Sequence, residues 1–335
     1  MDELISVIIP AYNIENYIGA TLDSVLQQTY RNLQIIVVND GSADGTGQVI
    51  DAYARTDSRI VPIHKENGGV TDARLRGLAQ AKGSYIGFVD GDDCIEPHMY
   101  EHLLNNLKCH RADISHCGYQ MVFPNGRVDH YHNTGTLLVQ KGAQGCADLL
   151  DGSMTEPGLW NKLYRRELFT GLGEWMDTSI RINEDLLMNF YLFRRAKICV
   201  FEDVSLYHYV LRKGSAATSR INEHKLKDPL RVQHLLEQET AAMPQWNRIV
   251  RRRLVYQLIR SATIEADGQK ELVIPFRKAA RKELRQRLWT TLKESSFDIK
   301  LKLMALWTAI WPASYGWIHR VYAKRTGLDK KYTVE

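Results

Sequence analysis

Cysteine is scarce in this sequence, and the few that occur fit no recognised framework. They are odd in number and widely spaced: Cys94, Cys109, Cys117, Cys146 and Cys199. A disulfide-stapled domain carries an even number of cysteines, and a structural zinc site needs closely paired ligands, so the sequence favours neither class. We expect reduced thiols in a cytosolic compartment.

Long apolar runs are also missing. A membrane-spanning helix needs about 20 consecutive apolar residues, and the nearest approach, Leu303 to Ile318, is short and contains Pro312. The first residues, Met1 to Glu3, are acidic and lack the basic region of a signal peptide. We therefore expect neither a spanning helix nor a secretory signal, and we expect a cytoplasmic location.

Three common motifs are absent as well. No G-x-G-x-x-G follows the first apolar run, which excludes the dinucleotide fingerprint. No G-x-x-x-x-G-K-[ST] occurs, which excludes a P-loop. The absence of G-x-S-x-G argues against an esterase elbow.

Charge is present but unevenly distributed along the 335 residues. Residues 221–335 hold 23 Lys and Arg against 12 Asp and Glu, a net of +11, whereas residues 1–220 carry a net of −6. A basic segment of this kind suggests an anionic partner, and nucleic acid and a membrane surface are the two candidates.

Short apolar runs of strand type alternate with helical patterns over the first hundred residues. The strand-like runs cover residues 5–9, 33–38, 59–63 and 85–89, and helical patterns follow at residues 18–26, 46–54 and 71–81. This alternation predicts βαβ units, and hence an α/β fold with a mostly parallel sheet and flanking helices.

The rest of the chain changes character. Asn125-Gly126 lies between two apolar runs and predicts a hairpin, and Asn183 opens a helical pattern that continues through Ala196. Residues 221–335 are helical in pattern almost throughout. We expect three regions, which are residues 1–110, 111–220 and 221–335.

Polar side chains follow each of the four strand-like runs, where ligands of parallel sheets bind. They are Tyr12, Asn13, Asp40, Lys65, Asn67, Asp90 and Asp92. The carboxylates of Asp90 and Asp92 suit Mg²⁺ or Mn²⁺, or they form an acidic solvated turn. Asp40 accepts hydrogen bonds from a base or ribose, or it forms an Asx-type turn.

Two further charged groups allow two interpretations each. Glu184 and Asp185 open a helix, where acids complement the helix dipole and Asn183 can serve as the N-cap. Arg74 follows a pair of glycines and can reach a diphosphate, or it lies on a solvated helix face.

These pieces resemble a known family. Five segments occur in the order and spacing of family 2 glycosyltransferases: Ile5–Asn13, Gln27–Tyr30, Ile35–Thr46, Asn67–Gly77 and Phe88–Asp93. Further matches cover Leu159–Phe169, Asn183–Asp185 and, more weakly, Tyr207–Ser215. Two departures are Asn39, where an Asp is commoner, and Leu75, where the family usually has Asn.

The resemblance implies a GT-A fold, a nucleotide-sugar donor, a divalent Mg²⁺ or Mn²⁺ and inversion at the anomeric carbon. Residues 1–110 would form the donor half and residues 111–220 the acceptor half. The implied site residues are Pro10, Tyr12 and Asp40 for the nucleoside, Asn67 and Arg74 for the base and diphosphate, Asp90 for the ribose and metal, Asp92 for the metal, Asp185 as general base, and Arg212 and Ser215 closing over the diphosphate. His208 is expected to be a hydrogen-bonded histidine rather than a metal ligand.

The function that this resemblance implies is transfer of a hexose or N-acetylhexosamine from a UDP-sugar to a hydroxyl of a glycan or polyprenyl-linked acceptor. The setting would be assembly of capsule, exopolysaccharide or lipopolysaccharide. One alternative is a sugar nucleotidyltransferase, which needs a Gly-rich basic loop that residues 10–13 do not supply. Another is an inactive GT-A domain that serves as a membrane adaptor.

A helical stripe of apolar residues runs through residues 302–325. It includes three of the seven tryptophans, Trp307, Trp311 and Trp317, with lysine and arginine on its flanks. Tryptophan beside cations is typical of a membrane interface, and here it favours an anionic surface at the inner face of the cytoplasmic membrane. The alternative is packing on the catalytic domain or in a homodimer. No nucleic-acid module is recognised.

Overall fold

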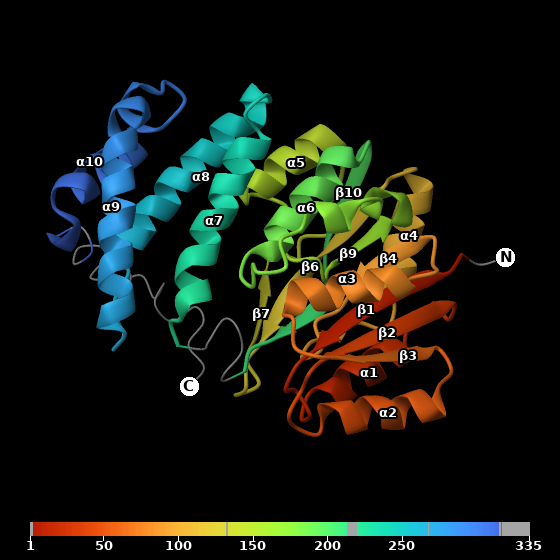
Figure 1. Cartoon of the computed structure of the whole chain (residues 1–335). Helices are drawn as coiled ribbons and strands as arrows, with labels where there is room; N and C mark the ends of the chain where they lie inside the picture. The colour runs from red at the N-terminus through yellow and green to blue at the C-terminus, as the bar shows by residue number, and fades with distance from the viewer. Residues whose placement is uncertain (1–2, 132, 213–219, 267, 315, 317–335) are drawn as a thin grey trace. The chain divides into compact units, whose positions relative to one another are not determined.

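The computed structural model describes residues 3–131, 133–212, 220–266, 268–314 and 316. The chain forms two compact units, Met1–Leu211 and Arg212–Glu335. The first unit is an α/β domain built on one large sheet, and the second consists of helices (Figure 1). The first unit contains the predicted residues 1–110 and, of the predicted 111–220, those up to Leu211. The separate roles of these two halves stay a prediction.

The sheet of the first unit has ten strands, with the order β3-β2-β1-β4-β9-β6-β10-β5 and with β7 on β6 and β8 on β10. The strands are β1 (Ile5–Ala11), β2 (Leu33–Asp40), β3 (Ile60–Lys65), β4 (Tyr85–Phe88), β5 (Cys94–Ile95), β6 (Ile114–Val122), β7 (Val128–Tyr131), β8 (Leu137–Lys141), β9 (Lys162–Arg165) and β10 (Ile198–Val210). The four predicted strands of the first hundred residues are β1 to β4, and they are parallel to one another.

Helices flank this sheet (Figure 1). They are α1 (Ile18–Leu26), α2 (Thr46–Thr56), α3 (Val70–Gln80), α4 (Met99–Cys109), α5 (Gly142–Asp151) and α6 (Glu184–Arg195), with 3-10 turns at Arg166–Phe169 and Leu172–Glu174. Parallel strands with flanking helices are the predicted fold class, which is confirmed. The predicted hairpin at Asn125-Gly126 joins β6 to β7.

The centre of the sheet is apolar on both faces, because helices cover it on both sides. Six of the seven residues of β1 and all eight of β2 are buried. Helix α3 approaches β1 closely at Gly77, where an added Cβ would lie 2.5 Å from a methyl carbon of Ile8. A larger side chain at residue 77 would therefore push α3 away from the strand whose end carries part of the site.

One antiparallel strand, β9, links the parallel strands β1 to β4 to the rest of the sheet. Strand β9 pairs with β4 on one side and with β6 on the other, and Leu163 lies opposite both Gly87 and Ser115. Strands β4 and β6 are consequently parallel to each other, and their carboxyl ends reach the same edge of the sheet. This register determines which residues of the two halves share that edge.

The second unit is made of α7 (Glu223–Glu239), α8 (Pro244–Thr263), α9 (Lys270–Lys293) and α10 (Ile299–Ile310). Its core joins α8, α9 and α10 through buried side chains such as Leu258, Leu284 and Leu301. Arg287 of α9 donates two parallel hydrogen bonds to the carboxylate of Glu237 on α7, at 2.8 and 2.9 Å. In the described part of the chain, no helix is both long enough and apolar enough to cross a bilayer.

Candidate functional site

The predicted rim residues lie at the carboxyl ends of the parallel strands. Asp40 is the last residue of β2, and Asp90 comes two residues after β4. Pro10 is half-buried in β1, and Tyr12 follows that strand with 51% of its surface exposed. Because these strands are parallel neighbours, the four residues share one edge of the sheet.

Asp40 is buried, and its carboxylate holds the loop that follows β3. It accepts hydrogen bonds from the backbone N–H groups of Gly68 and Gly69, at 2.9 and 2.8 Å, and from Lys65 Nζ at 2.5 Å. The side-chain amide of Asn67 donates to the Asp40 carbonyl at 3.0 Å. Asp40 thereby fixes the entry to α3, and Gly69 meets it with a φ of 90° that favours glycine.

The side chain that closes the turn after β2 is that of Asn39, the neighbour of Asp40. The Asn39 side-chain oxygen accepts a hydrogen bond from the Ser42 N–H at 3.1 Å, and its amide nitrogen lies 3.2 Å from His64 Nδ1. Asn39, the predicted departure from the family pattern, therefore has a local structural role. The carboxylate of Asp40 turns instead toward the 68–69 loop.

Arg74 of α3 is buried and joins two acidic groups from distant parts of the chain. Its Nη1 donates to Glu184 Oε1 at 2.7 Å, and its Nη2 donates to Asp90 Oδ1 at 3.0 Å. Only 5% of the Arg74 side chain is exposed, so the interpretation as a solvated helix residue is wrong. Arg74 thereby connects the end of β4 to the start of α6. The resemblance to the glycosyltransferases had implied a role for each of these segments but no contact between them.

Asp185 follows Glu184 at the start of α6, within electrostatic reach of Arg74 and Asp90. The Leu186 N–H donates to its Oδ1 at 2.7 Å. Asn183 occupies the N-cap position of α6, but it makes no side-chain capping hydrogen bond and has a left-handed φ of 65°. Glu184 and Asp185 therefore do more than complement the dipole of a solvated helix start.

Burial shifts the ionisation of this cluster. It raises the pKa of Glu184 to about 7, with the negative charge of Asp185 adding to the rise and Arg74 opposing it. Burial also raises the pKa of Asp185, again against the effect of Arg74. Burial alone would lower the pKa of the Arg74 guanidinium, but the negative charges of Asp90 and Glu184 hold this pKa above its ordinary value. One guanidinium thus faces more than one carboxylate, which leaves a surplus of negative charge.

Another buried acid, which the sequence did not single out, shapes the turn after β4. Asp93 is buried and accepts hydrogen bonds from the Tyr207 hydroxyl at 2.7 Å and from the Val210 N–H at 2.8 Å. The same hydroxyl accepts from the Asp90 N–H at 3.2 Å. Burial, together with Asp92 and Asp90, raises the pKa of Asp93 well above its ordinary value. The tyrosine of β10 therefore holds the turn that presents Asp90 and Asp92.

The donor set of this turn fits a divalent cation. Asp90 and Asp92 are half-buried carboxylates two residues apart, and hard cations such as Mg²⁺ take one or two protein carboxylates and complete their coordination with phosphate and water oxygens. Among the residues that the structure describes, no three His, Cys, Asp or Glu side chains form a metal-binding group. His208 lies 2.7 Å from Glu96 through its Nε2, in agreement with the expected hydrogen-bonded role.

Two predicted residues lie at or beyond the limit of the first unit. Arg212 is half-buried and is the first residue of the second unit. Ser215 lies outside the described residues. Closure of these residues over a diphosphate stays a prediction.

A buried lysine was also missed, although it stands within the quoted segment Leu159–Phe169. Lys162 is fully buried, and its Nζ donates to the carbonyls of Glu156 and Gly158 and to the side-chain oxygen of Asn161 at 2.6–2.7 Å. Burial lowers its pKa to about 8. No local pattern marks Lys162 as buried, because the strand β9 reads Lys-Leu-Tyr-Arg, with a cation at each end.

The fold, with its bridging antiparallel strand and the polar rim after β4, is that of the GT-A class. The profile of glycosyl transferase family 2 matches residues 6–173, half of the chain, and this chain belongs to that family. The predicted family and fold class are confirmed.

Relatives of known name support the same assignment. Uncharacterized glycosyltransferase EpsJ of Bacillus subtilis is 36% identical over 220 residues, which cover 62% of this chain and 61% of EpsJ. Glycosyltransferase GlyA of Streptococcus pneumoniae is 34% identical over 222 residues, which cover 64% of this chain but 32% of GlyA. GlyG from the same organism is 32% identical over 64% of this chain and 73% of its own length. The match thus spans less than two thirds of EpsJ and about a third of GlyA.

Solved structures share the fold. Staphylococcus aureus TarS 1–349, in complex with UDP-GlcNAc, superposes with a TM-score of 0.69 at 21% identity and covers 96% of this chain and 92% of that chain. Mannosyltransferase PcManGT from Pyrobaculum calidifontis, in complex with GDP-Man and Mn²⁺, gives a TM-score of 0.58 at 15% identity over 93% and 88% of the two chains. At these identities the likeness concerns the fold alone.

Proposed function

We propose that this chain is an inverting glycosyltransferase that moves a hexose or N-acetylhexosamine from a UDP-sugar to a hydroxyl of a glycan or lipid-linked acceptor. The observation that carries the proposal is the pair of hydrogen bonds from Arg74 to Asp90 and Glu184. Through them, the turn suited to a metal and the helix that carries Asp185 meet at one place. A donor diphosphate on one side and an acceptor hydroxyl on the other need this arrangement.

In this proposal, Asp185 accepts the proton of the acceptor hydroxyl as the oxygen attacks carbon 1 of the donor sugar. A positioned base of this kind contributes about 10²–10⁴-fold to the rate. Burial raises the pKa of Asp185, which makes its carboxylate a better proton acceptor than a solvated one. A single in-line displacement inverts the anomeric carbon and needs no covalent enzyme intermediate.

The leaving group is a nucleoside diphosphate that gains negative charge. A divalent Mg²⁺ or Mn²⁺ held by Asp92 and Asp90 would stabilise that charge as a Lewis acid when bound. Arg74 orients Asp90 through its hydrogen bond and keeps a positive charge beside the carboxylates. The named complexes of TarS with UDP-GlcNAc and of PcManGT with GDP-Man and Mn²⁺ support a nucleotide-sugar donor and a metal.

Residues at the rim would bind the nucleoside. Tyr12 exposes half of its surface beside Pro10, so its ring is accessible to a base. Asp40 lies at the end of the neighbouring strand β2 and Asn67 in the loop after β3, where Asp40 fixes the 68–69 loop. Their roles toward the base and ribose, like those of Arg212 and Ser215 toward the diphosphate, are part of the proposal.

A donor screen tests the proposal directly. Purified full-length chain is mixed with Mn²⁺, one of several UDP-sugars and an acceptor glycan, and released UDP is measured. We expect UDP release that depends on the acceptor and on Mn²⁺, and its loss by orders of magnitude in Asp92→Ala. Asp51→Asn is the matched control, because Asp51 is an exposed carboxylate on α2 that pairs with His64. Release of pyrophosphate would instead indicate a sugar nucleotidyltransferase. If the chain bound neither UDP nor Mn²⁺, it would be an inactive adaptor.

We further propose that the second unit holds the enzyme at an anionic membrane surface on the inner face of the cytoplasmic membrane, where a polyprenyl-linked acceptor for surface polysaccharide lies. Helix α10 exposes Ile299 and Leu303 by 71% and 56%, and Trp311, the residue after its end, is 64% exposed. Lys300 and Lys302 lie on the same helix. Exposed tryptophan and leucine beside lysine suit a membrane interface.

Part of the basic charge of the second unit already serves the fold. Arg281 and Arg285 donate to the carbonyl of Ala309, at 3.1 and 2.9 Å, and so satisfy the end of α10. The part of the predicted stripe beyond residue 316 lies outside the described residues. The alternative is that the apolar face of α10 forms a homodimer interface. A sedimentation measurement of the full chain distinguishes dimer formation from membrane binding.

A further inference from the structure

A network of hydrogen bonds joins strand β9 to α6, the helix that carries Asp185. Lys162 of β9 and Asn189 of α6 donate to the same acceptor, the carbonyl of Gly158, at 2.6 and 3.2 Å. Asn189 also donates to the carbonyl of Pro157 at 2.6 Å. The backbone at these two residues is therefore held from both sides, by the strand and by the helix.

Asn189 contacts β9 with the other end of its amide as well. Its Oδ1 accepts a hydrogen bond from the Tyr164 hydroxyl at 2.7 Å. Tyr164 comes two residues after Lys162 on β9, so both side chains leave the same face of the strand. Asn189 is buried and lies four residues after Asp185, which puts both residues on one face of α6. Strand β9 thus holds α6 one helical turn away from the proposed base.

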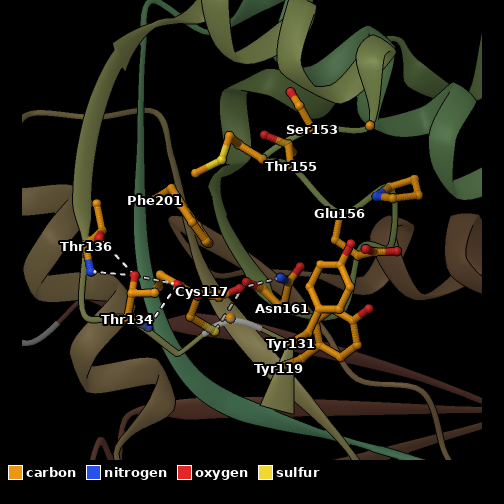
Figure 2. A pocket seen from close by; sticks show the side chains of 15 residues that line it. Cys117, Tyr119, Tyr131, Thr134, Thr136, Ser153, Thr155, Glu156, Asn161 and Phe201 are labelled. Carbon is orange, nitrogen blue, oxygen red and sulfur yellow. Dashed lines mark hydrogen bonds between the residues drawn. The ribbon is translucent and has the colours of Figure 1, made fainter. Parts of the chain in front are cut away.

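The ammonium group of Lys162 binds uncharged acceptors. They are the carbonyls of Glu156 and Gly158 and the side-chain oxygen of Asn161, at 2.6–2.7 Å, and they match the three donors of an ammonium group. Asn161 is itself fixed by Cys117 of β6 (Figure 2), because its amide donates to the Cys117 carbonyl and its own carbonyl accepts from the Cys117 N–H at 3.1 Å. The hydrogen bonds therefore fix the position of the ammonium group without neutralising its charge.

Several titratable groups face Lys162. Burial lowers the pKa of Lys162 to about 8, and Glu156, then Cys117 and then Asp185 of α6 oppose that effect. Burial raises the pKa of the Cys117 thiol to about 12, so the thiol is uncharged at neutral pH. His116, which lies opposite Lys162 on β6, is also neutral, because burial and the charge of Lys162 lower its pKa well below the ordinary value. The negative charges that favour the ammonium are those of Glu156 and Asp185.

The carboxylate of Asp185 lies among other acids. Burial raises its pKa, Arg74 opposes the rise, Asp90 adds to it and Lys162 opposes it. Both Nη atoms of Arg74 already donate to other carboxylates, those of Glu184 and Asp90. Lys162 supplies a second positive charge near Asp185, from β9 rather than from α3.

We propose that Lys162 is a positioning residue for the general base, which fixes α6 on β9 through the segment 156–158 and places a positive charge that favours the ionised form of the Asp185 carboxylate. The inference rests on the proposed function, because it takes Asp185 as the group that accepts the proton of the acceptor hydroxyl. A base accepts a proton only in its ionised form, so a cation at this place extends transfer toward lower pH. Asn189 shares the positioning but carries no charge, so substitutions separate the two contributions.

NMR of the lysine side chains measures the coupling between Lys162 and Asp185 without any need for activity. The full chain is labelled with ¹³C at lysine Cε, and the signal of Lys162 is expected to titrate near pH 8 and to vanish in Lys162→Arg. It should titrate at lower pH in Asp185→Asn, because a negative charge that favours the ammonium is gone. Glu156→Gln should lower it too, whereas Asp51→Asn, at an exposed position on α2, is the matched control and should leave it unchanged. Identical titration of Lys162 in the wild type and in Asp185→Asn would overturn the role of the charge.

Transfer kinetics separate the charge from the hydrogen bonds. Lys162→Gln keeps two N–H donors but removes the charge, so the acidic limb of the pH profile of kcat should move to higher pH by about 0.5–1 pH unit. Asn189→Leu keeps the charge but releases the 156–158 segment, so kcat should fall about tenfold while the acidic limb and the affinity for UDP stay unchanged. Arg165→Gln is the matched control, because it removes a half-buried cation from the other end of β9 and should change neither quantity.

Two kinetic results would overturn the proposal. They are an acidic limb at the same pH in the wild type and Lys162→Gln, and a wild-type kcat in Asn189→Leu. If Lys162→Gln does not fold, the NMR comparison still tests the charge. Absence of acceptor-dependent UDP release by the wild type would instead contradict the proposed function, and the NMR titration does not depend on that release.

Discussion

Arg74 and Glu184, 110 residues apart in the sequence, form a buried ion pair with Nη1 and Oε1 separated by 2.7 Å. The pair joins α3 to α6. The other end of the guanidinium binds Asp90. The geometry of the turn at Asp90 and the position of Asp185 are therefore coupled through a single side chain.

Removal of Arg74 should damage stability and activity together. Arg74→Ala leaves two carboxylates without their cation, one of them buried, and loss of one partner of a buried pair costs about 3–5 kcal/mol. We expect a corresponding fall in the free energy of unfolding, measured by urea denaturation of the first unit within the full chain. Arg76→Ala is the control, because Arg76 is exposed on the same helix. If Arg74→Ala and Arg76→Ala lowered the free energy of unfolding by the same amount, the stabilising role of the Arg74 ion pair would be contradicted.

The raised pKa of Glu184 should appear in the pH dependence of stability. Folding raises its pKa from 4.5 to about 7, so the folded state keeps a proton that the unfolded chain releases between these values. The stabilisation is complete below pH 4.5 and is lost as the pH rises to 7. Relative to Glu184→Gln, the wild type should lose on the order of 2 kcal/mol over that range.

This measurement needs urea denaturation of both chains with a chelator present, at several pH values between 4.5 and 8. The difference between the two chains isolates Glu184 from the other titrating groups. If the difference in unfolding free energy between the two chains stays constant across this pH range, burial does not raise the pKa of Glu184.

Tyr207 should act as a positioning residue for the turn after β4. Its hydroxyl donates to Asp93 and accepts from the Asp90 N–H. Tyr207→Phe leaves Asp93 short of a hydrogen bond, at a cost of about 1–3 kcal/mol, and should loosen the turn. We expect affinity for Mn²⁺ to fall about tenfold while KM for the acceptor is unchanged.

Calorimetric titration with Mn²⁺ and UDP measures that affinity. Tyr53→Phe is the matched control, since it also removes a hydrogen bond to a carboxylate, that of Asp23, at an exposed position. Equal Mn²⁺ affinities of the two variants would contradict a specific role for Tyr207.

Membrane binding should depend on the exposed face of α10. Leu303→Ser combined with Trp311→Ser should abolish most co-sedimentation of the full chain with vesicles that contain anionic lipid. High salt should weaken the binding of the wild type, because exposed charges are screened within ~8 Å at physiological ionic strength. Val128→Ser combined with Leu137→Ser removes exposed apolar groups of the first unit and should have no effect. Equal sedimentation of both double variants would refute the proposal.

The sequence predicts the elements of the first hundred residues well, because each signal is local. The apolar runs ending at Pro10 and Asp40 and the turn at Asp90 carry their own boundaries, and the structure has strands there. The edge that collects these residues follows from parallel pairing alone. The family resemblance added the order of the motifs, and the profile match confirms it.

Long-range partners could not be predicted in the same way. That Arg74 binds Glu184, or that Tyr207 binds Asp93, depends on how α3, α6 and β10 meet, and no local pattern contains that information. Local chemistry left two interpretations of Asp40 open, and its carboxylate binds the backbone of Gly68 and Gly69 rather than forming an Asx-type turn. There a tertiary contact outweighs the local preference.

The central claim is that Asp185 is the general base beside a metal-binding turn, and Asp185→Asn tests it most directly. The measurement is single-turnover transfer from a UDP-sugar to an acceptor glycan with Mn²⁺, together with calorimetric binding of UDP to the same variant. The account predicts a fall of about 10²–10⁴-fold in the transfer rate with UDP affinity unchanged. Transfer at the wild-type rate by a folded Asp185→Asn chain would contradict it.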